Sequence, residues 1–205
     1  QLLPCGALHW PARKLLAVAD LHLEKGSAAA HEGWLVPPYD SLETLTRIEA
    51  ALRRTGATTV ISLGDSLDDK GAPARMASPA RSLLARLVGD HHWIWITGNH
   101  DGAAAAGFGG LAVPEWRLAG ISFRHIADLA LPTPEISGHF HPVARLSGPG
   151  AGRRRCFALA GERLVLPAYG SYAGGLDAMS RDLADALGGA PDILLPSRAG
   201  IRRLR

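Results

Sequence analysis

The sequence predicts an α/β fold, with a parallel sheet in the first half and a second, mostly antiparallel sheet in the second half. Between residues 15 and 97, three apolar runs alternate with two amphipathic helical patterns, as in βαβ units. After residue 101 the helical spacing gives way to short alternating runs. A chain of 205 residues with no internal repeat or linker predicts one domain over residues 1–205.

The first half predicts buried strands joined by two helices. We expect strands near residues 7–10 and at 15–19, 58–63 and 93–97. The first helix, over residues 41–54, has apolar residues at helical spacing, and Gly56 stands just past its end. The second helix begins at Ser78, a good N-cap residue followed by proline, and ends at Gly89.

The second half predicts short strands and one short helix. The strands are expected at residues 120–125, 135–139, 142–146, 153–159 and 163–166, with a last one at 193–195. Residues 170–176 are predicted to form a loop, and residues 177–187 are predicted to form a helix. The basic tail at residues 198–205 is expected to be partly mobile.

Composition limits the partners and the compartment. The net charge is +3, from 22 basic and 19 acidic residues, which permits a polyanionic partner without requiring one. There is no apolar stretch of 18 residues, so no membrane span is predicted. Cys5 and Cys156 form no disulfide framework, which favours a reducing cytoplasm. The tryptophans are scattered and expected in the core: Trp10, Trp34, Trp93, Trp95 and Trp116.

Polar residues with metal-binding chemistry follow the predicted strands. They occur as Asp20-x-His22, Gly64–Asp65, Gly98–Asn99–His100–Asp101, His125 and Gly138–His139–Phe140–His141. Residues two apart in an extended segment point the same way, so Asp-x-His and His-x-His can each present two ligands. Imidazole, carboxylate and amide ligands without thiolate suit Mn²⁺, Fe or Zn²⁺. This set contains more ligands than one metal ion can coordinate, and it fits two ions that share a carboxylate.

In order and spacing, these motifs resemble those of the calcineurin-like metallophosphoesterase superfamily: DxH, GDxx(D/N), GNH(D/E), a lone His and GHxH. The resemblance implies a four-layer αββα β-sandwich with two metal ions at one end. It implies Asp20, His22 and His141 as ligands of the first ion, Asn99, His125 and His139 as ligands of the second, and Asp65 as the bridge. It also implies that His100 is the catalytic histidine and that Asp101 orients it.

Three further segments resemble a narrower bacterial branch, the ligase-associated DNA damage response endonucleases of the PdeM type. They are ADLHLEKGS at residues 19–27, PPYD at 37–40 and LPAYGSYAGGL at 166–176. This resemblance implies DNA as the substrate and DNA ligase and helicase repair proteins as associates. One departure is Asp68, where this branch has His. The roles of Asp68 and of the 166–176 loop stay open.

The resemblance implies hydrolysis of phosphodiester bonds through a metal-bridging hydroxide, with two divalent ions, Mn²⁺ before Fe or Zn²⁺. A DNA endonuclease or phosphodiesterase in bacterial DNA repair is the first hypothesis. The alternatives are a phosphodiesterase or phosphatase for small molecules, and a scaffold without catalysis. Lys25 could contact phosphate or pair with Glu24; Arg153, Arg154 and Arg155 could bind the phosphate backbone or form a solvated face.

Overall fold

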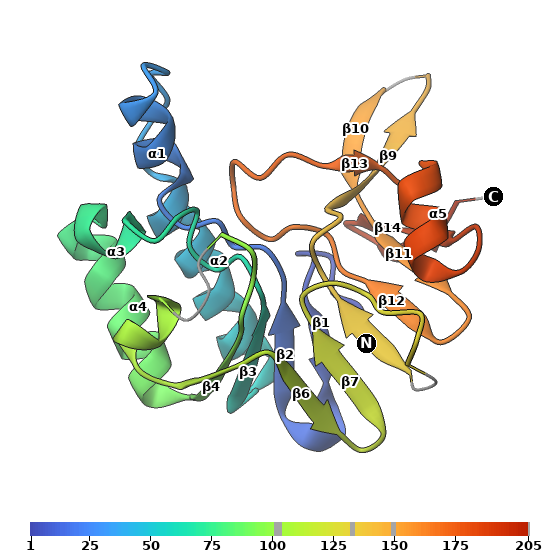
Figure 1. The fold of residues 1–205 in the computed structure, drawn as a ribbon, viewed down its shortest axis with the longest axis horizontal. Helices are drawn as coiled ribbons and strands as arrows, with labels where there is room; N and C mark the ends of the chain where they lie inside the picture. Colours follow the sequence, from blue (N-terminus) through green and yellow to red (C-terminus); the bar gives the residue numbers. More distant parts are fainter. Residues whose placement is uncertain (101–103, 132–133, 149–150, 205) are drawn as a thin grey trace.

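Two β-sheets face each other and helices cover their outer sides, in a computed structural model that describes residues 1–100, 104–131, 134–148 and 151–204. Helices α1 to α4 lie on one side of the molecule and α5 on the other (Figure 1). This layered α/β sandwich confirms the predicted fold class.

The first sheet carries the strand ends on which the site is built. Its order is β1 (Leu8–Trp10), β2 (Leu15–Val18), β3 (Thr59–Leu63), β4 (His92–Ile96) and β5 (Leu111–Val113). Strands β2 to β5 are parallel, and only β1 runs the other way. The carboxyl ends of β2, β3 and β4 therefore meet at one edge, where parallel sheets usually place their chemistry.

Two long helices pack on the outer face of this sheet, as the sequence predicts. Helix α2 (Asp40–Thr55) buries Leu45, Ile48 and Leu52 and ends at Gly56, whose φ of +65° suits glycine. Helix α4 (Ser78–Asp90) packs beside it. The sequence did not predict the short α1 (Lys25–His31) and α3 (Ala72–Arg75), nor the 3₁₀ turns η1 (Pro11–Arg13) and η2 (Ala104–Phe108).

The second half of the chain forms two sheets instead of one. A seven-stranded sheet has the order β15 (Gly200–Arg203), β14 (Asp192–Ser197), β11 (Phe157–Ala160), β12 (Arg163–Val165), β8 (Glu135–Ser137), β7 (Ile121–Arg124) and β6 (Glu115–Leu118). It is mixed, because β8 runs parallel to both neighbours. The smaller sheet contains β10 (Gly152–Arg155), β9 (Pro142–Leu146) and β13 (Leu176–Asp177). Helix α5 (Arg181–Leu187) begins at an N-cap, Ser180, whose Oγ accepts the Leu183 N–H.

Further expectations require correction. The helix expected at residues 177–187 begins only at Arg181, because Leu176–Asp177 pairs with β9 as the strand β13. The strand predicted at residues 153–159 is two strands of different sheets, because the chain crosses between them at the buried Cys156. The tail is not free over Gly200–Arg203, which pairs with β14 as an edge strand. Trp34 is 71% exposed, whereas Trp93 and Trp95 are buried as expected.

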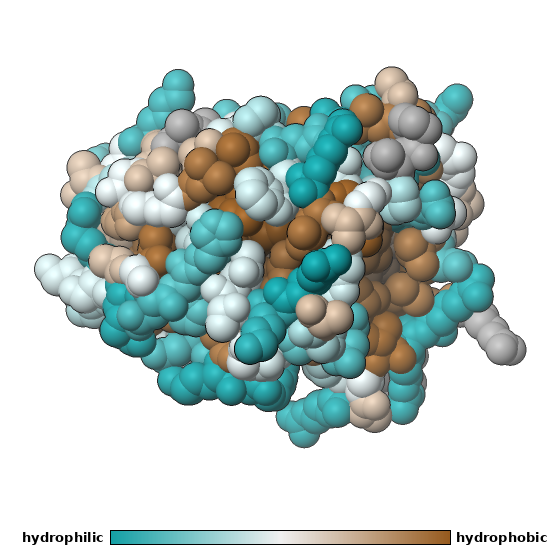
Figure 2. All heavy atoms as spheres, turned by 90° about the horizontal axis from the view of Figure 1, so that it is seen from below, coloured by the Kyte–Doolittle hydropathy of each residue, from teal (hydrophilic) through white to brown (hydrophobic). Residues whose placement is uncertain are grey.

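The core between the sheets explains why the strand runs are apolar throughout. Ala17, Ile61 and Ile94 face the second sheet and pack with Phe123 and Phe157. Alternate residues of the same strands face the helices, so both faces of the first sheet are buried. From below, at the end opposite the carboxyl ends of β2 and β3, polar side chains surround a central hydrophobic band (Figure 2). Within the described residues, no helix is long and apolar enough to cross a membrane.

Candidate metal centre

Two clusters of Asp and His side chains lie where the strands of both sheets end. The first contains Asp20, His22 and His141, and the second contains Asp65, His125 and His139. In each cluster, one ligand atom from every residue lies within 4.8 Å of the others. The fold therefore brings together six of the seven metal ligands expected from the sequence, out of segments up to 121 residues apart.

In the first cluster, imidazole and carboxylate donors converge. His22 Nε2 lies 3.4 Å from His141 Nε2, which is also 3.4 Å from Asp20 Oδ1. The other ring nitrogen of His22, Nδ1, is 3.0 Å from Asp68 Oδ1. Because the pKa of Asp68 is held below its usual range, this carboxylate accepts, and the His22 proton lies on Nδ1. The Nε2 lone pair is then free to bind a metal.

The second cluster is built in the same way. His125 Nδ1 lies 3.0 Å from the carbonyl oxygen of Leu63, which can only accept a hydrogen bond. His125 Nε2 therefore points inward, 3.3 Å from Asp65 Oδ2 and 3.2 Å from His139 Nδ1. A backbone carbonyl thus sets the ring orientation of His125, as hydrogen-bond partners commonly do for metal-binding histidines.

Asp20 joins the two clusters into one site. Its carboxylate accepts the backbone N–H of His139 at 2.9 and 3.1 Å, and Oδ1 lies 3.7 Å from His125 Nδ1. Asp20 is fully buried and Asp65 is 3% exposed. Two buried carboxylates among four imidazoles form a charge arrangement that divalent cations would balance.

The ionisation of the second cluster follows from the same contacts. Burial alone would raise the pKa of Asp65, but hydrogen bonds from His125 and the His100 N–H hold it well below its usual range. Burial lowers the pKa of His125, yet the hydrogen bond to Asp65 and the charge of Asp20 raise it overall. Burial and the nearby His125 charge lower the pKa of His139. Asp65 is therefore ionised and the His139 imidazole is predominantly neutral, as metal ligation requires.

The backbone at the site lies in an uncommon conformation. Five of the six clustered residues have positive φ: Asp20 at +51°, His22 at +42°, Asp65 at +42°, His139 at +69° and His141 at +45°. Residues other than glycine rarely adopt this region, and each such residue costs on the order of 1–3 kcal/mol. Backbone strain at five of the six clustered residues indicates that the orientation of their side chains serves a function. No pattern in the sequence predicted it.

Two motif glycines leave room for the clustered side chains. A Cβ on Gly64 would lie 2.2 Å from His125 Nδ1. A Cβ on Gly98 would lie 2.2 Å from both the backbone nitrogen and Oδ1 of Asp65. The Gly-Asp and Gly-Asn pairs therefore have a packing reason in addition to their turn geometry.

His100 lies at the open side of the site. Its side chain is 52% exposed, and Nε2 is 4.0 Å from Asp65 Oδ2. Its Nδ1 is 3.0 Å from the Asp68 carbonyl oxygen, and its backbone N–H donates to Asp65 Oδ1 at 2.9 Å. Asn99 is exposed at the same strand end, next to His100. Asp101, expected to orient His100, lies outside the described residues.

The basic residues suggested as substrate contacts are placed differently from one another. Lys25 Nζ lies 2.9 Å from Asp68 Oδ1, beside the first cluster, and not with Glu24 as in the alternative pairing. Arg153 donates to the Gly175 carbonyl, and Arg155 donates to several carbonyls of the 166–176 loop. Arg154 is exposed between them. Two of the three arginines therefore hold a loop.

The donor set fits divalent metal ions. In each cluster, ring nitrogens face one another at 3.2 to 3.4 Å, and carboxylate oxygens lie beside them. For His22 and His125, a partner on the opposite ring nitrogen turns the inward nitrogen toward the cluster. Once the imidazoles are deprotonated, ring nitrogens and carboxylate oxygens that converge in this way can coordinate a cation. Oxygen and imidazole donors without thiolate are typical of Mn²⁺, Fe and Zn²⁺ sites.

Comparison with known proteins shows which family and which solved structures this chain is similar to. A profile of the calcineurin-like phosphoesterases matches residues 13–186. Nuclease MPE of Pseudomonas putida superposes with a TM-score of 0.77 and 27% sequence identity, over 98% of this chain and 93% of that one. The E. coli phosphoesterase Yfce gives a TM-score of 0.48 and 17% identity, over 93% of this chain and 97% of that one. A search among curated proteins finds no match.

The sandwich fold and the paired Asp/His clusters assign this chain to the class of metal-dependent phosphoesterases. Because the profile covers most of its length, the chain belongs to the calcineurin-like phosphoesterase family.

Proposed function

We propose that this protein is a two-metal phosphodiesterase that cleaves DNA, with Mn²⁺ as its favoured ion. The observation that carries the proposal is the joined pair of Asp/His clusters, with His100 at their open side. We assign Asp20, His22 and His141 to the first ion, Asn99, His125 and His139 to the second, and Asp65 to both. When bound, two divalent ions activate water and polarise the phosphate oxygens.

His100 is the group proposed to assist the leaving oxygen. The Asp68 carbonyl accepts from Nδ1, so the ring is held with Nε2 toward the site. In the imidazolium form, Nε2–H can donate its proton to the alkoxide oxygen as the P–O bond breaks. General-acid assistance of this kind contributes on the order of 10²–10⁴ in rate. Its exposed side chain leaves room for a substrate. We keep Asp101 as a second orienting group, a role inferred from the motif alone.

Two observations support DNA as the substrate. The superposition with a nuclease covers 98% of this chain, and the net charge of +3 permits a polyanion. The branch motifs at residues 19–27, 37–40 and 166–176 extend the proposal to bacterial DNA repair, beside DNA ligase and helicase proteins. An intact donor set with His100 beside it argues against a scaffold without catalysis.

A substrate panel tests the proposal. With Mn²⁺, the protein should cleave single-stranded or duplex DNA and an aryl phosphodiester, and Asp65→Asn should abolish both activities. His31→Ala, an exposed histidine outside the clusters, is the matched control and should keep both. Turnover of cyclic nucleotides or phosphomonoesters with no cleavage of DNA would replace DNA with a small-molecule substrate. No turnover of any phosphoester would overturn the proposal.

A further inference from the structure

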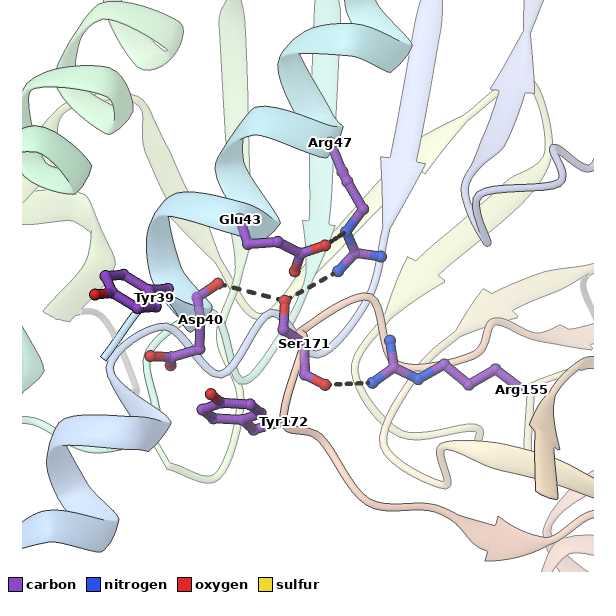
Figure 3. A pocket seen from close by; sticks show the side chains of 7 residues that line it. All are labelled: Tyr39, Asp40, Glu43, Arg47, Arg155, Ser171 and Tyr172. Atoms are coloured by element: carbon purple, nitrogen blue, oxygen red, sulfur yellow. Dashed lines mark hydrogen bonds and ion pairs between the residues drawn. The ribbon is translucent and has the colours of Figure 1, made fainter. Parts of the chain in front are cut away.

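A cavity beside the amino end of α2 is not part of the metal centre. Its volume is about 430 Å³, and its walls come from α2, β10 and the 166–176 loop. Figure 3 shows Tyr39 and Tyr172 on one side, the guanidinium groups of Arg47 and Arg155 on the other, and Ser171 between them. We call this the α2 cavity. Its residue types suit a ligand that is both anionic and aromatic.

The cationic side carries positive charge that the cavity does not neutralise. Arg155 donates to the carbonyls of Ser171 and Ala173 at 3.2 Å, and in the described part of the chain no carboxylate oxygen lies within 4.0 Å of it. Burial, followed by the charge of Arg47, lowers the pKa of Arg155. Two guanidinium groups that repel each other in a half-buried wall favour an anion between them.

The nearby acids leave one of the two arginines without an acidic partner. Glu43 is 51% exposed and pairs with Arg47 at 2.8 Å, so it offsets part of the charge on this side. Asp40 is 5% exposed, and its carboxyl group accepts the Gly26 backbone N–H at 3.1 Å on the side away from the two guanidinium groups (Figure 3). Arg155 is therefore left as a cation without an acidic partner in the cavity wall.

The aromatic side offers stacking surface. Tyr39 is 68% exposed at the start of α2. Tyr172 is 37% exposed, and its hydroxyl donates to the Pro37 carbonyl at 2.7 Å, which fixes the ring. Aromatic rings beside guanidinium groups bind nucleotides, because bases stack on the rings while phosphates pair with arginine.

The cavity and the metal centre share one loop. The Gly170 N–H donates to the Asp20 carbonyl at 3.1 Å, and the Gly170 carbonyl accepts from Arg155. Further along the loop, the Leu176 N–H donates to the His141 carbonyl at 3.1 Å. The loop thus contacts two residues of the first Asp/His cluster and also lines the cavity. Through this loop, the cavity wall is linked to the first Asp/His cluster.

We propose that the α2 cavity binds one nucleotide of the DNA strand whose scissile phosphate lies at the metal centre. Its phosphate would pair with Arg47 and Arg155, and its base would stack on Tyr39 and Tyr172. This proposal rests on the proposed function and names a second contact point for the same substrate. It also gives the 166–176 loop a role, as the element that joins the two contact points.

The test measures binding and cleavage of a fluorescent oligodeoxythymidylate by the full chain. Binding is followed by anisotropy in EDTA, which prevents cleavage, and turnover is measured with Mn²⁺. Tyr39→Ala should weaken binding roughly 5- to 150-fold, the range for loss of one base–aromatic stack. It should also raise KM for the oligonucleotide relative to KM for an aryl phosphodiester. Tyr39→Phe keeps the ring and should bind like the parent protein.

The arginine side has its own readout. Arg47→Ala should reduce the slope of log affinity against log salt by about 0.7, the value for one phosphate contact to a single strand. Arg53→Ala is the matched control, because Arg53 is on the same helix and pairs with Glu49 as Arg47 pairs with Glu43. It should leave affinity and slope unchanged. Should Arg47→Ala disturb the loop through its bond to the Tyr169 carbonyl, the two Tyr39 variants decide alone.

The outcomes separate this proposal from the proposed function. If Tyr39→Ala and Arg47→Ala both bind the oligonucleotide as the parent does, the residues are structural and the cavity proposal is wrong. Cleavage of DNA and of the aryl phosphodiester would still support the hydrolase. If the parent protein hydrolyses neither substrate with Mn²⁺, the proposed function fails whatever the cavity binds.

Discussion

The imidazole of His22 is held by the carboxylate of Asp68, with Nδ1 and Oδ1 3.0 Å apart. Lys25 Nζ lies 2.9 Å from the same oxygen. Burial alone would raise the pKa of Asp68, but hydrogen bonds from His22 and Lys25 hold it below its usual range. The carboxylate therefore stays ionised, keeps the His22 proton on Nδ1 and directs Nε2 into the first Asp/His cluster. Asp68 is thus a positioning residue for a proposed metal ligand.

This contact predicts that Asp68 affects metal affinity without binding the metal. Asp68→Ala should weaken Mn²⁺ binding about 10- to 100-fold, as expected for loss of such a partner. Asp68→Asn keeps an acceptor oxygen and should lose less. Calorimetry with Mn²⁺ measures affinity, and NMR of the His22 ring nitrogens reports the tautomer. Asp69→Ala removes a neighbouring carboxylate that pairs with Arg75, and it is the control. Equal affinities for the Asp68 and Asp69 variants would contradict the assignment.

A second prediction concerns His100. His100→Ala should keep both metal ions but lose about 10²–10⁴ in turnover of DNA, because the leaving alkoxide then departs without a proton. Hydrolysis of an aryl phosphodiester should fall less, since a phenolate needs less protonation. Steady-state kinetics with the two substrates measure the difference, and metal analysis confirms loading. Full activity of the variant on DNA would remove His100 from the mechanism.

A third prediction concerns Gly98. Gly98→Ala would put a methyl group 2.2 Å from the Asp65 backbone nitrogen and Oδ1, so Asp65 or the turn must shift. We expect a loss of about 1–3 kcal/mol in stability and weaker Mn²⁺ binding. Gly89→Ala is the control: Gly89 lies in α4, and a Cβ there meets nothing within 4 Å. It should stabilise by roughly 0.5–1 kcal/mol. Thermal unfolding compares the two, and equal effects would contradict the packing argument.

The motif positions could be predicted because parallel strands bring their carboxyl ends to one edge. Asp20 and Asp65 follow neighbouring strands, and their approach needs nothing beyond the βαβ order. His125 and His139 come from the second sheet, and their arrival at this edge was known only through the family resemblance. Local periodicity carries no information on how two sheets face each other.

Other features were hidden because they depend on distant partners. Asp68 could be recognised in the sequence as part of a motif, but its hydrogen-bond partner His22 lies 46 residues away in the chain. In the sequence, Arg155 is one member of a basic run. In the structure, its guanidinium group points inward and donates to carbonyls of the 166–176 loop. Positive φ at five clustered side chains is a tertiary effect, since local preference disfavours it at each of those residues. Sequence patterns thus located the site but not the contacts that orient its side chains.

A fourth prediction uses the two cysteines. Burial raises the pKa of the Cys156 thiol to about 12, so at pH 8 it is essentially all thiol, whereas the nucleophile is the thiolate. Cys5 is partly exposed. Iodoacetamide at pH 8 should therefore modify the native protein once, at Cys5, and the unfolded protein twice. Mass spectrometry counts and locates the adducts. Rapid labelling of Cys156 in the native protein would show that the crossing between β10 and β11 opens readily.

The last prediction concerns the number of metal ions. Two joined clusters, each with a buried carboxylate, predict that two Mn²⁺ bind, and that Asp65→Ala weakens both because it removes the proposed shared ligand. Binding only to the folded state stabilises it by about 2.7 kcal/mol at a metal concentration 100 times Kd. Thermal unfolding should therefore show a higher Tm with Mn²⁺ than with EDTA, and a much smaller difference for Asp65→Ala. His31→Ala, outside the clusters, should behave like the parent. One ion per chain, bound equally well without Asp65, would contradict the two-metal assignment and leave the second cluster without a metal role.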